Sequence, residues 1–411
     1  MQTLRQDAQT IIDRALADAL PDAAVRRALA QFHAPEGRLI LIAAGKAAWQ
    51  MASAAYAALG AQITGGAVIT KYGHSRGPVG PLEIFEAGHP VPDENSCRAT
   101  ARALALVGGL RAEDTVLFLL SGGGSALFES PLVPLEELTD ITKQLLACGA
   151  DIVEMNTLRK RLSAVKGGRF AERCFPAKVF SIVLSDILGD PLDMIASGPA
   201  CPDSSTCTQA LAIVKKYDLH LSAHALALLA QETPKALPNI ETHITGSVRQ
   251  LCASAEAAAR SLGYTPVVLT HCLRCTARDA GSFLASIAQS HQDCASSLAF
   301  IAGGETVVQL TGAGLGGRNQ ELALAAAQEI AGCKDTAVFS FGSDGTDGPT
   351  DAAGGYCDGG TRAALAAKGI SIPDILRQND SYHALQACGG LIVTGPTGTN
   401  VNDLSVLLIR R

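Results

Sequence analysis

An α/β fold in two domains is predicted by this sequence, and three observations support the prediction. The chain has 411 residues, more than one hydrophobic core usually organises. Apolar residues make up 47% of it and charged residues only 18%, and 41 residues are glycine, which is typical of parallel sheets covered by Ala- and Leu-rich helices. Short apolar runs also alternate with longer helical patterns along most of the chain.

The first half predicts a Rossmann-like, doubly wound parallel sheet. The expected strands are 39–43, 67–70, 84–87, 116–120 and 179–184, and the expected helices are 47–59, 96–107, 135–146 and 151–165. Pro234 and Pro238 interrupt this alternation, so we expect a domain boundary near residue 235. The predicted domains are therefore residues 1–235 and 236–411.

The second half predicts another α/β domain, in this case with a mixed sheet. The expected strands are 266–269, 298–302, 307–310, 337–341, 391–393 and 404–409. Only Gly303, Gly304 and Glu305 separate the second of these from the third, so some antiparallel pairing is expected. The same three residues are candidates for cofactor binding. We expect the active site in the cleft between the two domains.

Charge and cysteine usage exclude several classes of protein. The formal net charge is -6 without blocks of like charge, so neither nucleic acid nor an anionic membrane is an expected partner. Residues 1–20 show a helical stripe rather than a signal peptide, which predicts a cytoplasmic protein. The 12 cysteines are scattered, as reduced thiols are, and Cys272 and Cys275 lack the second ligand pair of a structural zinc site. Whether the chain forms a homo-oligomer is left open.

A glycine-rich turn after the strand at 116–120 is the first candidate for phosphate binding. It contains Ser121, Gly122, Gly123, Gly124 and Ser125. Three glycines let backbone N–H groups approach phosphate oxygens, and the serines add hydroxyl donors. The alternative is an ordinary tight turn, but such a turn seldom requires all five residues. No Walker A lysine follows.

Gly45 and Lys46 end the first strand and precede a helix, which places an ammonium at the carboxyl edge of the sheet. Lys46 could reach the γ-phosphate of a nucleotide, although a solvated lysine is the alternative. Asp186 and Asp190 follow a later strand and could orient a hydroxyl group and bind Mg²⁺, unless they merely form a turn.

A basic segment around residues 151–167 presents Asn156, Arg159 and Lys166 at helical spacing. This face suits a carboxylate or a phosphate, and the alternative is a solvated basic face. In the second half, Gly316 and Gly317 end a literal GxGxxG segment and precede Arg318, which indicates a phosphate clamp. Two further loops, 342–351 and 394–403, are rich in polar residues and glycine and are expected to bind nucleotide or substrate.

Six segments together resemble the glycerate 2-kinase family, whose C-terminal domain is called MOFRL. They are SGGGSALFESP, DIVEMNTLRKRLSAVKGGRFA, SDILGDPLDMIASGP, GGETVVQLTGAGLGGRNQELAL, GSDGTDGPTDAAGG and LIVTGPTGTNVNDL. The resemblance runs from about residue 10 to residue 408. It implies a cytoplasmic enzyme that uses Mg·ATP to phosphorylate D-glycerate at the 2-hydroxyl, giving 2-phosphoglycerate and ADP.

The same resemblance implies roles for individual residues. Lys46 and Arg318 would neutralise the transferring phosphoryl group, and Asp186 would act on the 2-hydroxyl. His89 matches a further block of the family and is expected near the substrate. The alternatives are an NAD(P)H-dependent hydroxypyruvate reductase, which would need the GxGxxG segment to hold a dinucleotide, and a non-catalytic module that binds a nucleotide or sugar acid.

Overall fold

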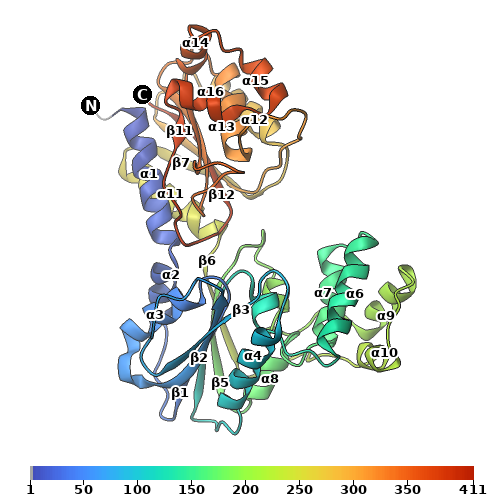
Figure 1. Ribbon diagram of the computed structural model, residues 1–411. Helices are drawn as coiled ribbons and strands as arrows, with labels where there is room; N and C mark the ends of the chain where they lie inside the picture. Colours follow the sequence, from blue (N-terminus) through green and yellow to red (C-terminus); the bar gives the residue numbers. More distant parts are fainter. Residues whose placement is uncertain (1–2) are drawn as a thin grey trace. The chain divides into compact units, whose positions relative to one another are not determined.

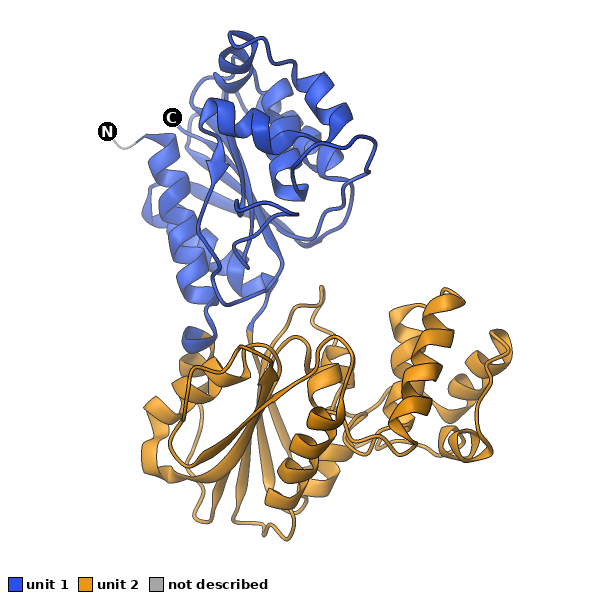
Figure 2. Ribbon diagram, viewed as in Figure 1, with its two compact units in different colours: residues 1–23, 246–411 blue, residues 24–245 orange. Residues whose placement is uncertain are grey.

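The computed structural model describes residues 3–411 and contains two compact units (Figure 2). Unit 2 comprises residues 24–245. Unit 1 comprises residues 246–411 together with the N-terminal segment that ends at Ala23. Two α/β units are therefore present, as the composition predicts.

The limits of these units differ from the predicted domains. The unit changes after Thr245 rather than near residue 235, because β6 (Ile240–Gly246) joins the sheet of unit 2. At the other end, α1 (Leu4–Ala19) belongs to unit 1. Its buried Asp7 accepts a 2.6 Å hydrogen bond from the hydroxyl of Tyr264, which fixes the helix there.

A six-stranded sheet forms the centre of unit 2 (Figure 1). Its order is β3-β2-β1-β4-β5-β6, and the pairs β1–β2, β2–β3, β1–β4 and β4–β5 are parallel. This is the order of a doubly wound sheet whose direction of growth reverses between β1 and β4. The fold class predicted for the first half is confirmed. Besides β6, the strands are β1 (Leu39–Ala44), β2 (Ile63–Lys71), β3 (Leu82–Ala87), β4 (Thr115–Leu120) and β5 (Lys178–Leu184).

Helices cover both faces of this sheet, so its strands read as continuous apolar runs. In β1, Leu39 and Leu41 pack with α3, whereas Ile40 and Ile42 pack with α4 and α8. The helices are α2 (Pro21–Leu29), α3 (Ala48–Leu59), α4 (Glu94–Leu106), α5 (Gly124–Leu127) and α8 (Arg169–Cys174), with 3₁₀ turns η1 (Gly60–Gln62) and η2 (Ile195–Ser197).

Four further helices of unit 2 form a small bundle to one side of the sheet (Figure 1). The bundle has its own apolar core, which includes Leu138, Leu158, Ile213 and Leu228. The helices expected at 135–146 and 151–165 are found in it, although the second ends earlier. The bundle consists of α6 (Leu135–Ala147), α7 (Ile152–Arg161), α9 (Cys207–Lys216) and α10 (Ala223–Leu229).

Unit 1 contains a mixed sheet of order β11-β10-β9-β12-β8-β7. The pair β7–β8 is parallel, and the other four pairs are antiparallel. The mixed sheet is thus confirmed, but the predicted strand 307–310 is wrong, because Val307 makes only an isolated bridge and Leu310 is 83% exposed. Two of the antiparallel pairs arise instead because β12 inserts between β8 and β9, and the other two join β10 to β9 and to β11.

The strands of unit 1 are β7 (Thr265–Leu273), β8 (Leu298–Gly304), β9 (Thr336–Gly342), β10 (Gly354–Asp358), β11 (Leu391–Ile392) and β12 (Asp403–Ile409). Its other helices are α11 (Val248–Ser261), α12 (Ala277–Ser290), α13 (Arg318–Glu329), α14 (Thr361–Ala366), α15 (Ile372–Gln378) and α16 (Ser381–Cys388). Within residues 3–411, no helix combines the length and the apolar character needed to cross a membrane.

Candidate active site

The turns that follow β1 and β4 are joined at the point where the sheet order reverses. Gly45 has φ +127°, and a Cβ there would overlap the Ser121 side chain, so only glycine fits. The Lys46 N–H donates to the carbonyl of Gly122 at 2.9 Å, and the Ala47 N–H donates to Ser121 Oγ at 3.1 Å. These bonds place Lys46, whose side chain is exposed, beside the glycine-rich turn.

The glycine-rich turn itself is shaped to approach a ligand closely. Gly123 has φ +84° and precedes the single turn of α5. Among the hydrogen bonds between main-chain groups of residues 3–411, none uses the N–H groups of Gly122 or Gly123. Two adjacent N–H groups that donate to no carbonyl are an arrangement that suits an anion.

Side chains from three different strands converge on this turn. A Cβ on Gly122 would overlap Oδ2 of Asp186. A Cβ on Gly123 would lie 2.9 Å from Cδ2 of His89 and 3.2 Å from Cγ of Lys46. The structure therefore brings Lys46, His89 and Asp186 together around Gly122 and Gly123, as the sequence predicts.

His89 lies in the loop after β3 and is partly buried. Burial lowers the pKa of its imidazole, and the cations Lys46 and Lys71, with His74, lower it further. The ring is therefore uncharged near neutral pH. It can donate or accept a hydrogen bond there without adding positive charge to a site that already contains Lys46.

Asp186 and Asp190 both lie in the loop after β5. Asp186 is partly buried, and Asp190 has a positive φ of 53°. The described residues contain no group of three or more acidic, His or Cys side chains that could hold a metal ion. A magnesium ion here would depend on phosphate oxygens as well as these carboxylates, which is how Mg²⁺ commonly binds beside nucleotides.

Two of the expected substrate ligands, Asn156 and Lys166, have partners inside the protein. Lys166 is fully buried; its ammonium donates to the Ser125 carbonyl at 2.8 Å and pairs with Glu129 at 3.1 Å. Asn156 Oδ1 accepts a 2.9 Å hydrogen bond from Ser197 Oγ, which lies 3.4 Å from Ser125 Oγ. Lys166 thus contacts the glycine-rich turn directly, and Asn156 is linked to it through Ser197. Helical spacing alone does not distinguish that role from substrate binding.

Arg318 is the first residue of α13 in unit 1, and two carboxylates hold its guanidinium. It donates through Nε and Nη2 to Asp403, at 2.5 and 3.0 Å, and its Nη1 lies 2.9 Å from Glu305. Burial lowers the pKa of Arg318, but the hydrogen bond and charge of Asp403 outweigh burial, so the net shift is upward. Arg318 is a permanent cation with about a third of its side chain exposed.

The glycines expected to bind cofactor in unit 1 are closely packed against protein atoms. Gly303 and Gly304 lie inside β8 rather than after it; a Cβ at Gly303 would overlap Cys252 or stand too near Val248. Gly316 and Gly317 precede α13, where a Cβ would overlap Ser381 or Asp347. In each case the absence of a side chain serves close packing within unit 1.

Asp347, in the glycine-rich loop after β9, is a buried carboxylate beside Arg318 that the sequence motifs did not single out. Its carboxylate accepts the backbone N–H groups of Asn319 at 3.1 Å and Gln320 at 2.9 Å, so it caps α13 immediately beside Arg318. Burial raises its pKa to about 6 in spite of these donors. The sequence of loop 342–351 repeats Asp-Gly, but it does not show which of its carboxylates faces the helix.

Comparison with known proteins assigns the chain to a family. A model described as a domain of unknown function, DUF4147, matches residues 7–230, and the MOFRL family model matches residues 298–403. The chain is 52% identical to the D-glycerate 2-kinase of Thermotoga maritima over 99% of both chains. It belongs to the glycerate 2-kinase family.

Solved structures agree with this assignment to the glycerate 2-kinase family. The crystal structure of the glycerate kinase from Thermotoga maritima matches with a TM-score of 0.94 at 52% identity, covering 99% of each chain. A Pyrococcus horikoshii protein matches with a TM-score of 0.95 at 36% identity, covering 100% of this chain and 99% of the other. One relative, from Agrobacterium vitis, is 40% identical over 98% of this chain and 94% of its own and is named a putative hydroxypyruvate reductase.

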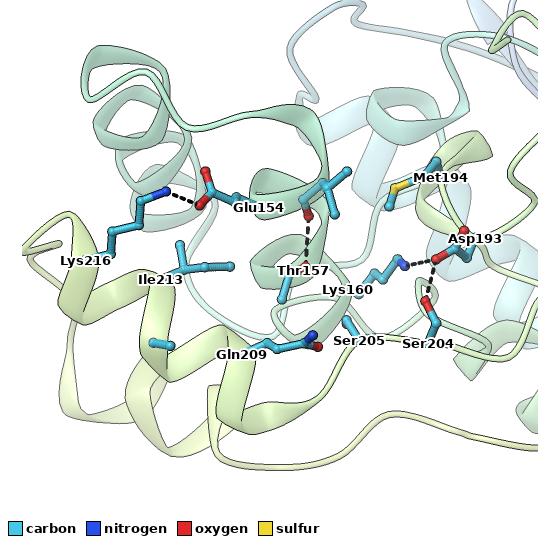
Figure 3. A pocket seen from close by; sticks show the side chains of 12 residues that line it. Glu154, Thr157, Lys160, Asp193, Met194, Ser204, Ser205, Gln209, Ile213 and Lys216 are labelled. Atoms are coloured by element: carbon cyan, nitrogen blue, oxygen red, sulfur yellow. Dashed lines mark hydrogen bonds and ion pairs between the residues drawn. The ribbon is translucent and has the colours of Figure 1, made fainter.

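Unit 2 of this glycerate 2-kinase family member contains two cavities of note. The larger, about 390 Å³, lies between α7 and α9, and Figure 3 shows its lining. Its buried cation, Lys160, is paired with Asp193 at 3.1 Å and with Asp203 at 3.0 Å. The smaller, about 130 Å³, is lined by Pro90, which follows His89, and by Ser125 and Arg159.

Proposed function

We propose that this protein transfers the γ-phosphoryl group of ATP to the 2-hydroxyl of D-glycerate, giving 2-phosphoglycerate and ADP. One observation carries the proposal: Lys46, His89 and Asp186 surround a turn whose Gly122 and Gly123 N–H groups donate to no main-chain carbonyl. Phosphoryl transfer requires chiefly positioning and charge neutralisation, and this set supplies both. Membership of the glycerate 2-kinase family supports the choice of substrate.

In the proposed reaction, the 2-hydroxyl oxygen of glycerate attacks the γ-phosphorus. Its proton passes to Asp186, and the bond from the γ-phosphorus to the oxygen that bridges it to the β-phosphorus breaks, leaving ADP. Lys46 compensates the charge on the transferring group. His89, uncharged near neutral pH, orients the acceptor by a hydrogen bond.

The glycine-rich turn from Ser121 to Ser125 would hold phosphate oxygens. Asp186 and Asp190 would hold Mg²⁺ together with the nucleotide. The ion would supply further neutralisation of the phosphate charge. Arg318 remains a proposed catalytic cation, as the family resemblance implies, and Glu305 remains a proposed cofactor-binding residue.

A hydroxypyruvate reductase is the alternative, and the name of the Agrobacterium vitis relative favours it. That activity would need residues 312–317 to bind a dinucleotide after a buried strand. The segment follows no strand, and a Cβ at Gly312 or Gly314 would overlap Gln378. We therefore favour the kinase.

The cytoplasm is our proposed location, because the described structure has 12 free cysteines and no disulfide.

Turnover assays test the proposed function directly. We expect purified protein with Mg·ATP and D-glycerate to release ADP and to form 2-phosphoglycerate, identified by ³¹P NMR against authentic 2- and 3-phosphoglycerate. With hydroxypyruvate and NADH or NADPH, we expect no oxidation of the cofactor. Reductase turnover without ADP release would reject the kinase, and binding without any turnover would favour a non-catalytic module.

A further inference from the structure

Arg159 is a partly buried arginine that lacks a partner among the described residues. It lies on α7, and among residues 3–411 its guanidinium makes no hydrogen bond and no ion pair within 4.0 Å. Glu129 is the acidic group that acts on its charge, but that carboxylate is already paired with Lys166 at 3.1 Å. Burial lowers the pKa of Arg159 more than the charge of Glu129 raises it.

Neighbouring buried cations of unit 2 contrast with Arg159. Lys160 pairs with Asp193 and Asp203, as Figure 3 shows for the first of these. Arg161 pairs with Glu232 at 3.2 Å, and Arg169 donates to the Ser163 carbonyl at 2.7 Å. Buried charges are normally paired, so an unpaired one indicates a missing anion.

The cavity beside Arg159 has the size and the location for such an anion. Its volume of about 130 Å³ suits a molecule much smaller than a drug-sized ligand. Leu138 lines its apolar wall, and Lys143 adds a second positive charge. Because Ser125 belongs to the glycine-rich turn and Pro90 follows His89, the cavity adjoins the proposed catalytic groups.

Glu129 also lines the cavity, but its carboxylate does not oppose an anionic ligand. It pairs with the Lys166 ammonium and accepts the N–H of Ser130 at 2.9 Å. Its charge is therefore compensated before any ligand binds. The charges that a ligand meets in the cavity are therefore the positive charges of Arg159 and Lys143.

We propose that this cavity is the carboxylate subsite of the enzyme and that Arg159 binds the carboxylate of the hydroxy-acid substrate in a bidentate pair. The inference rests on the proposed function, which it deepens. In a 2-hydroxy acid the reacting hydroxyl is bonded to the carbon next to the carboxylate. Anchoring the carboxylate at Arg159 consequently presents the 2-hydroxyl, rather than a more distant hydroxyl, to the catalytic groups.

The test compares acceptors with and without a carboxylate, using D-glycerate and glycerol. For Arg159→Met we expect the KM for D-glycerate to rise on the order of 100-fold, the value typical of a lost charge-assisted bidentate pair. The KM for ATP should stay unchanged, and so should any turnover of glycerol. Arg159→Lys should recover part of the loss. Equal losses for both acceptors, or an unchanged KM for D-glycerate, would overturn the subsite.

Two control variants and one binding measurement complete the test. Arg173→Met removes an exposed arginine of α8, and its KM for D-glycerate should match that of the wild type. Lys143→Met removes the other cation of the cavity. A larger rise in the KM for D-glycerate in Lys143→Met than in Arg159→Met would overturn the assignment of Arg159. Calorimetric titration with D-glycerate separates two hypotheses: that the protein is a kinase, and that Arg159 binds the substrate carboxylate. If the wild type binds D-glycerate without turnover while Arg159→Met does not bind, the kinase is rejected and the subsite stands. If both proteins bind D-glycerate equally and the wild type phosphorylates it, the subsite is rejected and the kinase stands.

Discussion

The carboxylate of Asp186 lies directly against Gly122, so closely that a Cβ on that glycine would overlap Oδ2. The two residues follow different strands, β4 and β5, which pair in parallel and end at the same edge of the sheet. A residue of the glycine-rich turn and the proposed general base are thus held in contact by the sheet itself. Absence of a side chain at Gly122 is what admits the carboxylate.

Replacing Gly122 by alanine should therefore displace Asp186 while leaving the fold intact. We expect Gly122→Ala to lower kcat at least tenfold, because the added methyl group and the carboxylate cannot occupy the same space. The matched control is Gly65→Ala in β2, where nothing lies within 4 Å of the added Cβ. Steady-state kinetics and thermal unfolding of both variants provide the measurement. Wild-type turnover in Gly122→Ala would show that the position of Asp186 is unimportant.

Loss of Lys46 should affect the reaction far more than the stability. Its ammonium makes no ion pair with the described residues, and its side chain is exposed. We expect Lys46→Met to lower kcat on the order of 100- to 1,000-fold, as loss of a charge-stabilising group does, and to leave the melting temperature nearly unchanged. Lys215→Met, at another exposed lysine, is the control. Similar kinetics in the two variants would exclude Lys46 from catalysis.

Arg318 should contribute to both stability and activity, and a double variant can separate the two. Arg318→Ala leaves Asp403, which is 5% exposed, without its partner, so we expect it to lower the free energy of unfolding by about 2–3 kcal/mol. Adding Asp403→Asn removes the unpaired charge and should restore much of that stability. If Arg318 acts on the phosphoryl group, kcat stays low in the double variant. Recovery of kcat together with stability would assign Arg318 a purely structural role.

Continuous burial explains which strands the sequence reveals. β1, β4 and β12 are buried throughout, so each reads as an unbroken or nearly unbroken apolar run. The polar strand β6 has no such run and escaped the prediction, which displaced the expected boundary. The strand predicted at 307–310 was wrong for the opposite reason. Leu310 is apolar but exposed, so its hydrophobicity does not indicate a buried, paired strand.

The candidate site could be predicted in part, because glycine-rich turns after parallel strands must meet at one sheet edge. The sequence places Lys46 and Asp186 at one sheet edge in this way, and their roles stay predictions. The sequence could not show that Lys166 has a structural role rather than a role in substrate binding. Its partner Glu129 lies on another segment, and sequence spacing does not reveal that contact. Arg159, on the same basic segment, has no such partner. Only the three-dimensional contacts separate these two cations.

The last prediction concerns pH and Asp347, a buried carboxylate that is 3% exposed. Burial raises its pKa from 3.8 to about 6 in the folded protein. Between these values the folded state binds more protons than the unfolded state, so the free energy of unfolding falls as the pH rises. The loss begins above pH 4 and is complete somewhat above pH 6, where it amounts to about 3 kcal/mol.

Urea denaturation of the wild type and Asp347→Asn, at pH values from about 4 to 7.5, measures this effect. Asparagine cannot ionise, so the variant lacks the loss, although it also caps α13 less well at every pH. We therefore expect the stability of the variant relative to the wild type to increase by up to about 3 kcal/mol as the pH rises through this range. A difference that does not change with pH, or that changes in the opposite direction, would mean that Asp347 is ionised in the folded protein throughout, held by the N–H groups of Asn319 and Gln320.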